Sequence, residues 1–377
     1  MDLIKLHQDN IVNLVTRRIA LLNRPFIAKR ILAQLDFSLL GSLAAILPTH
    51  LHTLDALSTE SVSTIFLQVF YGIYKQPETT IKALDANLED FTDEQLSSLS
   101  MALLLANVHF DTLSDLPKTT GLRQLFLLNC AHLPTSIVFE WLQQEEKDDL
   151  AAACIQYLGR LDFLSYEALV RNYAQSNKAL TRLSALLVLT LNGCLESSQL
   201  LSQESLNTLT LIPQALATAC RLHPHIFFDQ SPLCAALTGK PKAIHHLIKQ
   251  MQNASTLKEA YSAWLWLTGR TLPHYPALQS TDIKPRYIPP SDRSVPDVQA
   301  AKSWYKRQKW QAQQHYFLGQ PLTKSGLKIL TKNQAGQCIS LLAVHQQLLA
   351  LPITANQKGF CLNGVMQVCR FTSQETS

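Results

Sequence analysis

The chain has 377 residues, of which 47% are hydrophobic and only 16% are charged, and its formal net charge is +5. This length is enough for a large core, arranged as two or three domains or as one extended repeat array. Abundant Leu and Ala with only 12 glycines favour helices over sheets. No window approaches the roughly 18 consecutive apolar residues of a spanning helix, and residues 1–10 lack the apolar region of a secretory signal.

Eight cysteines are scattered along the chain, and no two of them form a C-x-x-C motif. Most lie within apolar helical runs, where free Cys packs as a small hydrophobe. Structural thiols are the main interpretation, with disulfides or metal ligation as the alternative. Scattered core thiols without a secretory signal indicate the reducing cytoplasm.

Residues 1–147 are expected to form an N-terminal helical region. Apolar residues recur there at helical spacing, and Pro25 and Pro48 end the runs before them. Asp93 is a suitable N-cap for the helix that follows it. The predicted helices cover residues 3–22, 26–35, 37–47, 64–75, 94–107, 119–130 and 134–144.

A short pattern recurs in residues 148–270: an apolar helical run ends at a glycine, and another helical pattern soon begins. The glycines are Gly159, Gly193, Gly239 and Gly269, at intervals of 34, 46 and 30 residues. Because glycine readily adopts the left-handed conformation that closes a helix, each is expected to end one. The intervals resemble the period of stacked helix pairs, so we expect an all-α fold, an irregular HEAT-like α-solenoid of stacked helix pairs. The predicted helices here cover residues 148–158, 165–174, 177–192, 213–222, 231–237, 241–252 and 256–268.

Residues 271–297 interrupt this pattern with six of the seventeen prolines, which predicts an extended linker or strap. Residues 298–377 are expected to form a basic C-terminal helical region, with helices over 297–317, 322–331 and 335–349. Between Val298 and Thr376 the only acid is Glu375, against nine Lys and Arg, whereas residues 1–297 carry a net charge of −3. Asn363-Gly364 suits a tight turn in a short hairpin.

The sequence predicts no metal site, no cofactor and no enzymatic activity. The pairs His50/His52, His223/His225 and His245/His246 lack a further ligand at the spacing that zinc sites use. Neither the nucleophile elbow, nor the phosphate loop, nor the dinucleotide fingerprint occurs. An enzyme or secreted effector assembled from distant residues remains an alternative, recognisable by a deep pocket with converging polar groups.

One segment of the C-terminal region combines basic and aromatic side chains. On a continuous helix, Lys302, Lys306 and Lys309 share one face. The simplest interpretation is an amphipathic helix with aromatics in the core and lysine stems reaching outward. An acidic protein partner, or nucleic acid or lipid, is the alternative. The candidate partner-binding residues are Lys302, Trp304, Lys306, Arg307, Lys309 and Trp310, together with Trp266 on the helix over 256–268.

Trp266 is two residues from Trp264, so the two rings face apart on a helix. At least one of the two is expected in the core, and the other is a candidate anchor for a partner or for the proline-rich strap.

Two segments resemble a known family. Residues 303–305 and 314–322, which read Ser-Trp-Tyr and Gln-His-Tyr-Phe-Leu-Gly-Gln-Pro-Leu, look like the W-W and R-Y-L-x-G-x-P-L stretches of HEAT-repeat-like proteins encoded in bacterial type VI secretion clusters. Residues 263–272 are similar to that family's A-x-x-L-I-T-G-x-x-L run. At the N-terminus, Arg18, Pro25 and Leu35-Asp36 follow the family's order, and residues 42–47 stand where it has A-H-L-D-G-L.

The resemblance implies a non-enzymatic accessory or assembly scaffold in the cytoplasm. It would bind protein components of the secretion machine through the concave face of the helical array or through the basic C-terminal region. A HEAT-like protein that binds nucleic acid through the basic C-terminal region is the alternative. It ranks lower, because groove binders spread their basic residues over successive repeats. The sequence sets neither the identity of the partner nor the oligomeric state.

Overall fold

A computed structural model of the chain describes residues 3–46, 62–106, 116–129, 133–144, 147–276 and 294–349. These residues form 20 α-helices, one 3₁₀ turn and six short strands, which confirms the expected all-α class. The chain divides into two compact units. Unit 1 comprises residues 1–194, 331–343 and 352–377, and unit 2 comprises residues 195–330 and 344–351. No described helix has the length and apolar character needed to cross a membrane.

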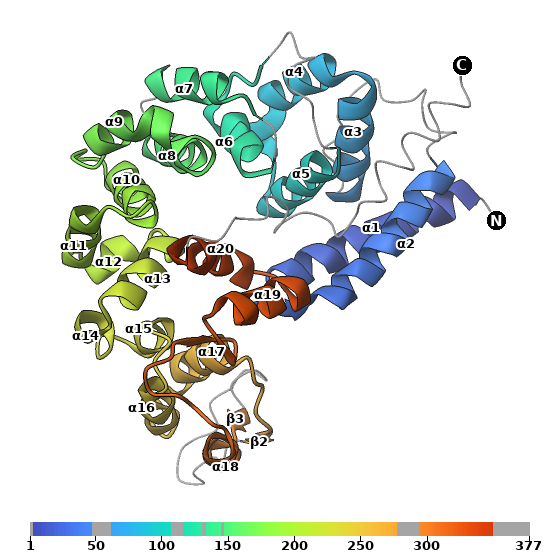
Figure 1. Cartoon of the computed structure of the whole chain (residues 1–377). Coiled ribbons are helices and arrows are strands. Elements are labelled where there is room, and N and C mark those ends of the chain that lie inside the picture. The colour runs from blue at the N-terminus through green and yellow to red at the C-terminus, as the bar shows by residue number, and fades with distance from the viewer. Residues whose placement is uncertain are drawn as a thin grey trace, which may run out of the picture. The chain divides into compact units, whose positions relative to one another are not determined.

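Unit 1 is built from helices that pack mainly on helices one or two places away along the chain, such as α1 on α2 and α3 on α5 (Figure 1). Its elements are α1 (Leu3–Leu22), β1 (Ile27–Ala28), α2 (Lys29–Ile46), α3 (Val62–Lys75), α4 (Pro77–Asn87), a 3₁₀ turn (Leu88–Asp90), α5 (Asp93–Ala106), α6 (Thr120–Asn129), α7 (Thr135–Gln144), α8 (Asp148–Leu161), α9 (Phe163–Tyr173), α10 (Ala179–Leu191) and β6 (Gln334–Ala335).

Helix α8 lies at the centre of the second half of unit 1, where it contacts α6, α7, α9 and α10. The prediction that Gly159 ends this helix is wrong, because α8 continues to Leu161. Gly159 is buried, and a Cβ atom added there would collide with Val188 of α10. Glycine is therefore present at this position because two helices approach closely, and not because the chain turns.

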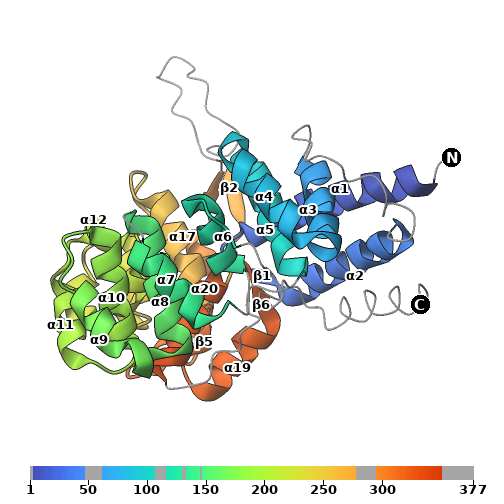
Figure 2. The ribbon, with the colours of Figure 1, turned by 90° about the horizontal axis from the view of Figure 1, so that it is seen from above.

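The N-terminal helices of unit 1 are joined to a distant part of the chain. Ile27 pairs antiparallel with Ala335 in the β1–β6 ladder, and the two strands lie side by side in Figure 2. Leu21, Leu32 and Leu35 pack with these two residues in one apolar cluster. The helices predicted over 26–35 and 37–47 are instead one helix, α2, which begins directly after β1.

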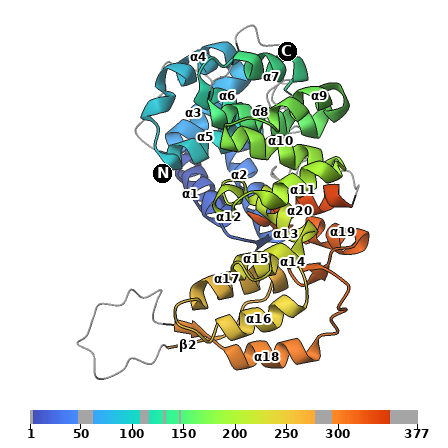
Figure 3. The same cartoon turned by 90° about the vertical axis from the view of Figure 1, so that its left-hand side faces the viewer.

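Unit 2 is also helical, and its core contains the fully buried Trp264 with apolar residues of α15, α16 and α17. Figure 3 shows α18 running beside α16. The division between the units falls inside α19 and α20. The elements are α11 (Leu195–Gln203), α12 (Leu206–Leu209), α13 (Pro213–Leu222), α14 (Pro224–Phe227), α15 (Pro232–Leu237), α16 (Lys242–Gln250), α17 (Leu257–Thr268), β2 (His274–Pro276), β3 (Ser294–Pro296), α18 (Val298–Arg307), β4 (Tyr316–Phe317), β5 (Gln320–Pro321), α19 (Lys324–Asn333) and α20 (Cys338–Leu348).

Three of the four repeated glycines have the expected left-handed backbone: Gly193, Gly239 and Gly269, with φ of +93°, +68° and +63°. In unit 2 these turns have a second role, because the segment around β4 crosses the ends of α15 and α17. The Tyr316 N–H donates to the Gly239 carbonyl at 2.8 Å, and the Leu318 N–H donates to the Trp266 carbonyl at 2.9 Å. A Cβ on Gly239 or Gly269 would lie 2.8 Å from a backbone oxygen of this segment. Residues 263–272 and 314–322, which carry part of the family resemblance, therefore pack against each other.

The proline-rich segment is described only at its two ends, where β2 and β3 pair antiparallel with His274 opposite Pro296. Residues 277–293 between them, and the hairpin predicted at Asn363-Gly364, lie outside the described residues.

Candidate functional site

Helix α18 carries most of the residues singled out in the sequence. It begins at Val298 because the Asp297 carboxylate accepts the N–H groups of Gln299 and Ala300, at 2.8 and 2.9 Å. It ends at Arg307, and Gln308 is already extended. The prediction of one helix over 297–317 is therefore wrong, and Lys309 does not share a helix face with Lys302 and Lys306.

The aromatic side chains of this segment pack into unit 2. The Trp304 ring meets Trp264 edge to face at 5.3 Å between centroids, and Trp310 at 5.7 Å. Trp310 also stacks on Tyr305 and meets Tyr316 edge to face at 4.5 Å. Such edge-to-face contacts stabilise an aromatic cluster beyond the area it buries. Trp304 and Trp310 therefore belong to the packing of unit 2.

The cations of the segment point away from this cluster. Lys306, Arg307 and Lys309 are exposed, and Lys302 is half-buried. None of the four forms an ion pair with a described residue, and the only partner of Arg307 is the Ser303 carbonyl at 3.1 Å. The described residues of unit 2 include twelve Lys and Arg against five Asp and Glu. These cations therefore belong to a unit whose described residues carry an excess of positive charge.

Trp266 lies apart from the other six candidates. Its half-buried ring stacks on Phe317 of β4 at 6.0 Å, and Phe317 in turn contacts His345 at 5.2 Å. Trp264 is fully buried, and its Nε1–H donates to the Arg270 carbonyl at 2.7 Å, so the expected core position is confirmed. Trp266 contacts β4, and within the described residues the strap does not cover it.

The histidine pairs occupy separate environments. His223 hydrogen-bonds with the Ser198 hydroxyl at 2.8 Å, while His245 and His246 contact the rings of Tyr305 and Phe228 respectively. Within the described residues, no three His, Cys, Asp or Glu side chains converge as metal ligands would. The pair His50/His52 lies outside the described residues.

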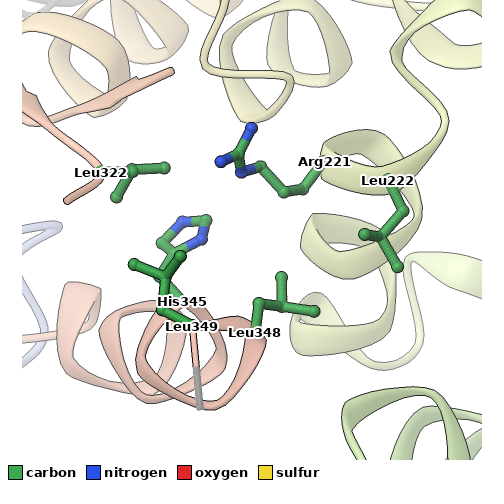
Figure 4. A pocket seen from close by; sticks show the side chains of 6 residues that line it. All are labelled: Arg221, Leu222, Leu322, His345, Leu348 and Leu349. Atoms are coloured by element: carbon green, nitrogen blue, oxygen red, sulfur yellow. The ribbon is translucent and has the colours of Figure 1, made fainter. Parts of the chain in front are cut away.

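The structure also shows a pocket that the sequence analysis missed. It lies within unit 2, between α13 and the end of α20, and has a volume of about 220 Å³. In Figure 4 the Arg221 guanidinium and the His345 imidazole point toward each other across the opening. The remaining lining is apolar and consists of Leu222, Leu322, Leu348 and Leu349.

The electrostatics of this pocket are uniformly positive. Burial lowers the pKa of Arg221 to about 10, so this side chain is charged at neutral pH. Burial, together with the charge of Arg221, lowers the pKa of His345 to about 3 and that of His315 to about 4. Burial and the charges of Arg221 and Lys242 also lower the pKa of Lys240. Arg221 forms no ion pair with a described residue. Among the described residues, the pocket thus contains a cation without an anionic partner.

Only a weak sequence signal marks this pocket. Arg221 is the single charged residue of α13, and it directly follows the mainly apolar run Ala-Leu-Ala-Thr-Ala-Cys. His345 lies 124 positions later in the chain, and nothing local to either residue indicates that the two meet. The fold brings them together through α13 and α20.

Comparisons of the chain with family models, with curated proteins and with solved structures found no match.

Proposed function

We propose that the chain is a non-enzymatic scaffold of a bacterial type VI secretion system that acts in the cytoplasm by binding other proteins of the assembly. In this proposal the stacked helices form an irregular HEAT-like α-solenoid. The binding surface is the basic outer side of α18 and the residues that follow it, and the partner presents acidic side chains.

The first support is the way the helices pack. In unit 1, α8 contacts both α7 and α9, and in unit 2, α16 contacts both α15 and α17. Neighbour-on-neighbour stacking is how repeat proteins bury apolar faces that a single helix pair leaves open. Rigid surfaces of this kind suit binding, because they lose little conformational entropy when a partner docks.

The observation that carries the proposal is the division of α18 into two sides. Its aromatic side is taken up by contacts with Trp264 and Trp310, which fixes the helix on unit 2. Its outer side presents Lys306 and Arg307, which form no ion pair with any residue that the structure describes. A fixed helix with free cations matches an acidic surface, since complementary charge speeds encounter and selects partners.

The proposal is tested by charge reversal in the source cells. The variant Lys306→Glu/Lys309→Glu is compared with Lys324→Glu/Lys328→Glu, which reverses two exposed lysines elsewhere in unit 2. We expect cross-linking and pull-down of the unaltered chain to recover secretion components. The first variant should lose at least about tenfold of this recovery, and the second should retain it.

Recovery of no secretion component with the unaltered chain would count against the secretion role. Equal recovery with both variants would remove the α18 surface from the proposal while leaving the scaffold role in place.

A second candidate is nucleic-acid binding, and the observation that favours it is the positive excess of unit 2. Phosphate contacts weaken steeply with salt, because binding releases condensed counterions. A filter-binding titration at two salt concentrations separates the candidates. A steep loss of affinity for single- or double-stranded DNA supports this second function, and no binding at low salt rules it out.

A further inference from the structure

We propose that the pocket between α13 and α20 binds a small apolar carboxylate, with Arg221 holding the carboxylate and the four leucines covering the hydrocarbon part. This goes beyond the scaffold role and does not depend on it.

The charge of Arg221 is the first argument. Arg221 is half-buried, lines the pocket and forms no ion pair with a described residue. Its charge acts on Lys240, His315 and His345, which are positive or neutral, and no carboxylate of the described residues lowers or raises its pKa. A partly buried charge without a counter-charge is unfavourable, and an anion in the pocket would relieve this.

The second argument is independent and comes from His345. This side chain is 3% exposed, and its Nδ1 atom has no hydrogen-bond partner among the described residues. Figure 4 shows its ring directed into the pocket toward the guanidinium of Arg221. The low pKa of His345 keeps the imidazole neutral at pH 7, so it has one N–H to donate. A buried polar group without a partner is uncommon in folded proteins, and in this proposal a ligand atom in the pocket satisfies it.

Size and lining define the class of ligand. The volume of about 220 Å³ is below the range of roughly 300–1,000 Å³ typical of drug-sized ligands. It corresponds to about seven water volumes, and hence to a ligand of about eight heavy atoms. Four leucines disfavour a hydrated dianion such as phosphate and favour a branched hydrocarbon. A planar carboxylate matches the fork of Arg donors in a bidentate contact.

Two sources supply this chemistry: a free short-chain carboxylic acid, or the C-terminal residue of a peptide. The shared feature is a carboxylate joined to an apolar group of four to six carbons. 4-Methylpentanoate represents the free acid. N-acetyl-leucine represents the peptide terminus, and its acetyl group stands for the preceding peptide, which would lie outside the pocket.

The test is a ligand-observed NMR titration of the full chain with both carboxylates and with their neutral amides. We expect at least one carboxylate to bind saturably, and its amide to bind at least tenfold more weakly. Binding of N-acetyl-leucine alone would identify the peptide source, and binding of 4-methylpentanoate alone the free acid. The proposal would be overturned if neither carboxylate bound saturably.

Variants separate the pocket from the rest of the basic surface. Arg221→Gln should weaken carboxylate binding at least tenfold, whereas Arg307→Gln, which removes an exposed charge on α18, should leave it unchanged. Leu322→Phe should weaken binding by filling the pocket while keeping the cation. Since Arg221 has no ion pair to lose, the Arg221→Gln variant should keep the helical circular dichroism of the unaltered chain. Binding by Arg221→Gln equal to that of the unaltered chain would contradict the proposal.

Discussion

Arg18 of α1 and Asp36 of α2 form an ion pair inside the N-terminal helix hairpin, with exposed fractions of 1% and 0%. Arg18 Nε donates to Asp36 Oδ1 at 2.6 Å, and a second nitrogen is 3.5 Å from Oδ2. Removing two charges from water is expensive, and the pair offsets this only while both partners remain. The sequence analysis noted these two residues through the family resemblance alone, and the structure supplies their physical connection.

Replacing one partner of this pair should strongly destabilise unit 1. We expect Asp36→Ala to lower the free energy of unfolding by about 3–5 kcal/mol, because Arg18 then stays buried without its carboxylate. The apolar double variant Arg18→Met/Asp36→Leu should be much closer to the unaltered chain. Chemical denaturation followed by circular dichroism measures both. A double variant as unstable as the single one would show that the pair itself provides the stability.

The buried histidines of unit 2 predict a loss of stability on acidification. The folded chain keeps His345 neutral down to a pKa of about 3 and His315 down to about 4, against an ordinary value of 6.5. The unfolded chain therefore binds more protons below pH 6.5, and the free energy of unfolding falls as the pH drops.

This pH dependence is measured by urea denaturation between pH 7 and pH 5. His345→Gln removes one titrating group, so its stability should change less with pH than that of the unaltered chain. His315→Gln should act in the same direction. Identical slopes for the unaltered chain and for both variants would mean that these histidines have the same pKa in the folded chain as in the unfolded chain.

At the scale of elements, the close packing of α8 on α10 depends on one missing side chain. Gly159→Ala adds a methyl group where Val188 lies, and such overpacking costs about 1–3 kcal/mol. In the background Val188→Ala the same substitution should be neutral or stabilising, because alanine is the better helix former by about 1 kcal/mol. A double-mutant cycle from thermal unfolding gives the coupling between the two positions. If the two substitutions changed the stability additively, contact with Val188 would not be the cause of the cost of Gly159→Ala.

Strong local signals explain why several elements could be predicted. The helices α1 and α13 begin and end where the spacing of apolar residues and the prolines indicate. Helix α4 was not predicted, because its sequence PETTIKALDAN is largely polar and buries only three residues. The end of α18 was missed because apolar and aromatic residues continue past Arg307, although they serve a loop and a strand there.

The candidate sites, too, could be predicted only as far as local sequence patterns reach. The basic and aromatic composition of residues 302–310 is visible in the sequence, but which side chains face the core depends on Trp264, some 40 positions earlier. The pocket at Arg221 was invisible for a similar reason, since it needs α13, Leu322 and α20 together. Local patterns predict helices, while contacts between distant segments create the surfaces on which function depends.

At the scale of the whole chain, unit 1 is discontinuous: its first helices are completed by residues near the other end. Gln337 and Cys338 donate backbone hydrogen bonds to the carbonyls of Arg24 and Pro25, at 3.0 and 2.9 Å. Gly336 permits this approach with φ of +93°, and a Cβ there would lie 2.7 Å from the Arg24 oxygen. These contacts, together with the β1–β6 ladder, close the apolar cluster around Ile27.

Two glycines with the same backbone angle provide a matched test of this closure. Gly193 also has φ of +93°, but a Cβ there would meet nothing within 4 Å. Gly193→Ala should therefore cost only the left-handed conformation, about 1–2 kcal/mol, while Gly336→Ala should cost more because of the collision. Thermal unfolding compares the two variants. Equal losses of stability would show that the collision with the Arg24 carbonyl does not contribute to the cost of Gly336→Ala.

The β1–β6 ladder also has a consequence for synthesis. Ala28 is translated about 300 residues before its strand partner Gln334. At about 5–20 residues per second, α1 and α2 wait about 15–60 s with Ile27 and its apolar neighbours uncovered. During that interval the nascent chain exposes a hydrophobic surface of the kind that chaperones bind. We therefore expect chaperones to bind the N-terminal helix hairpin until translation is almost complete.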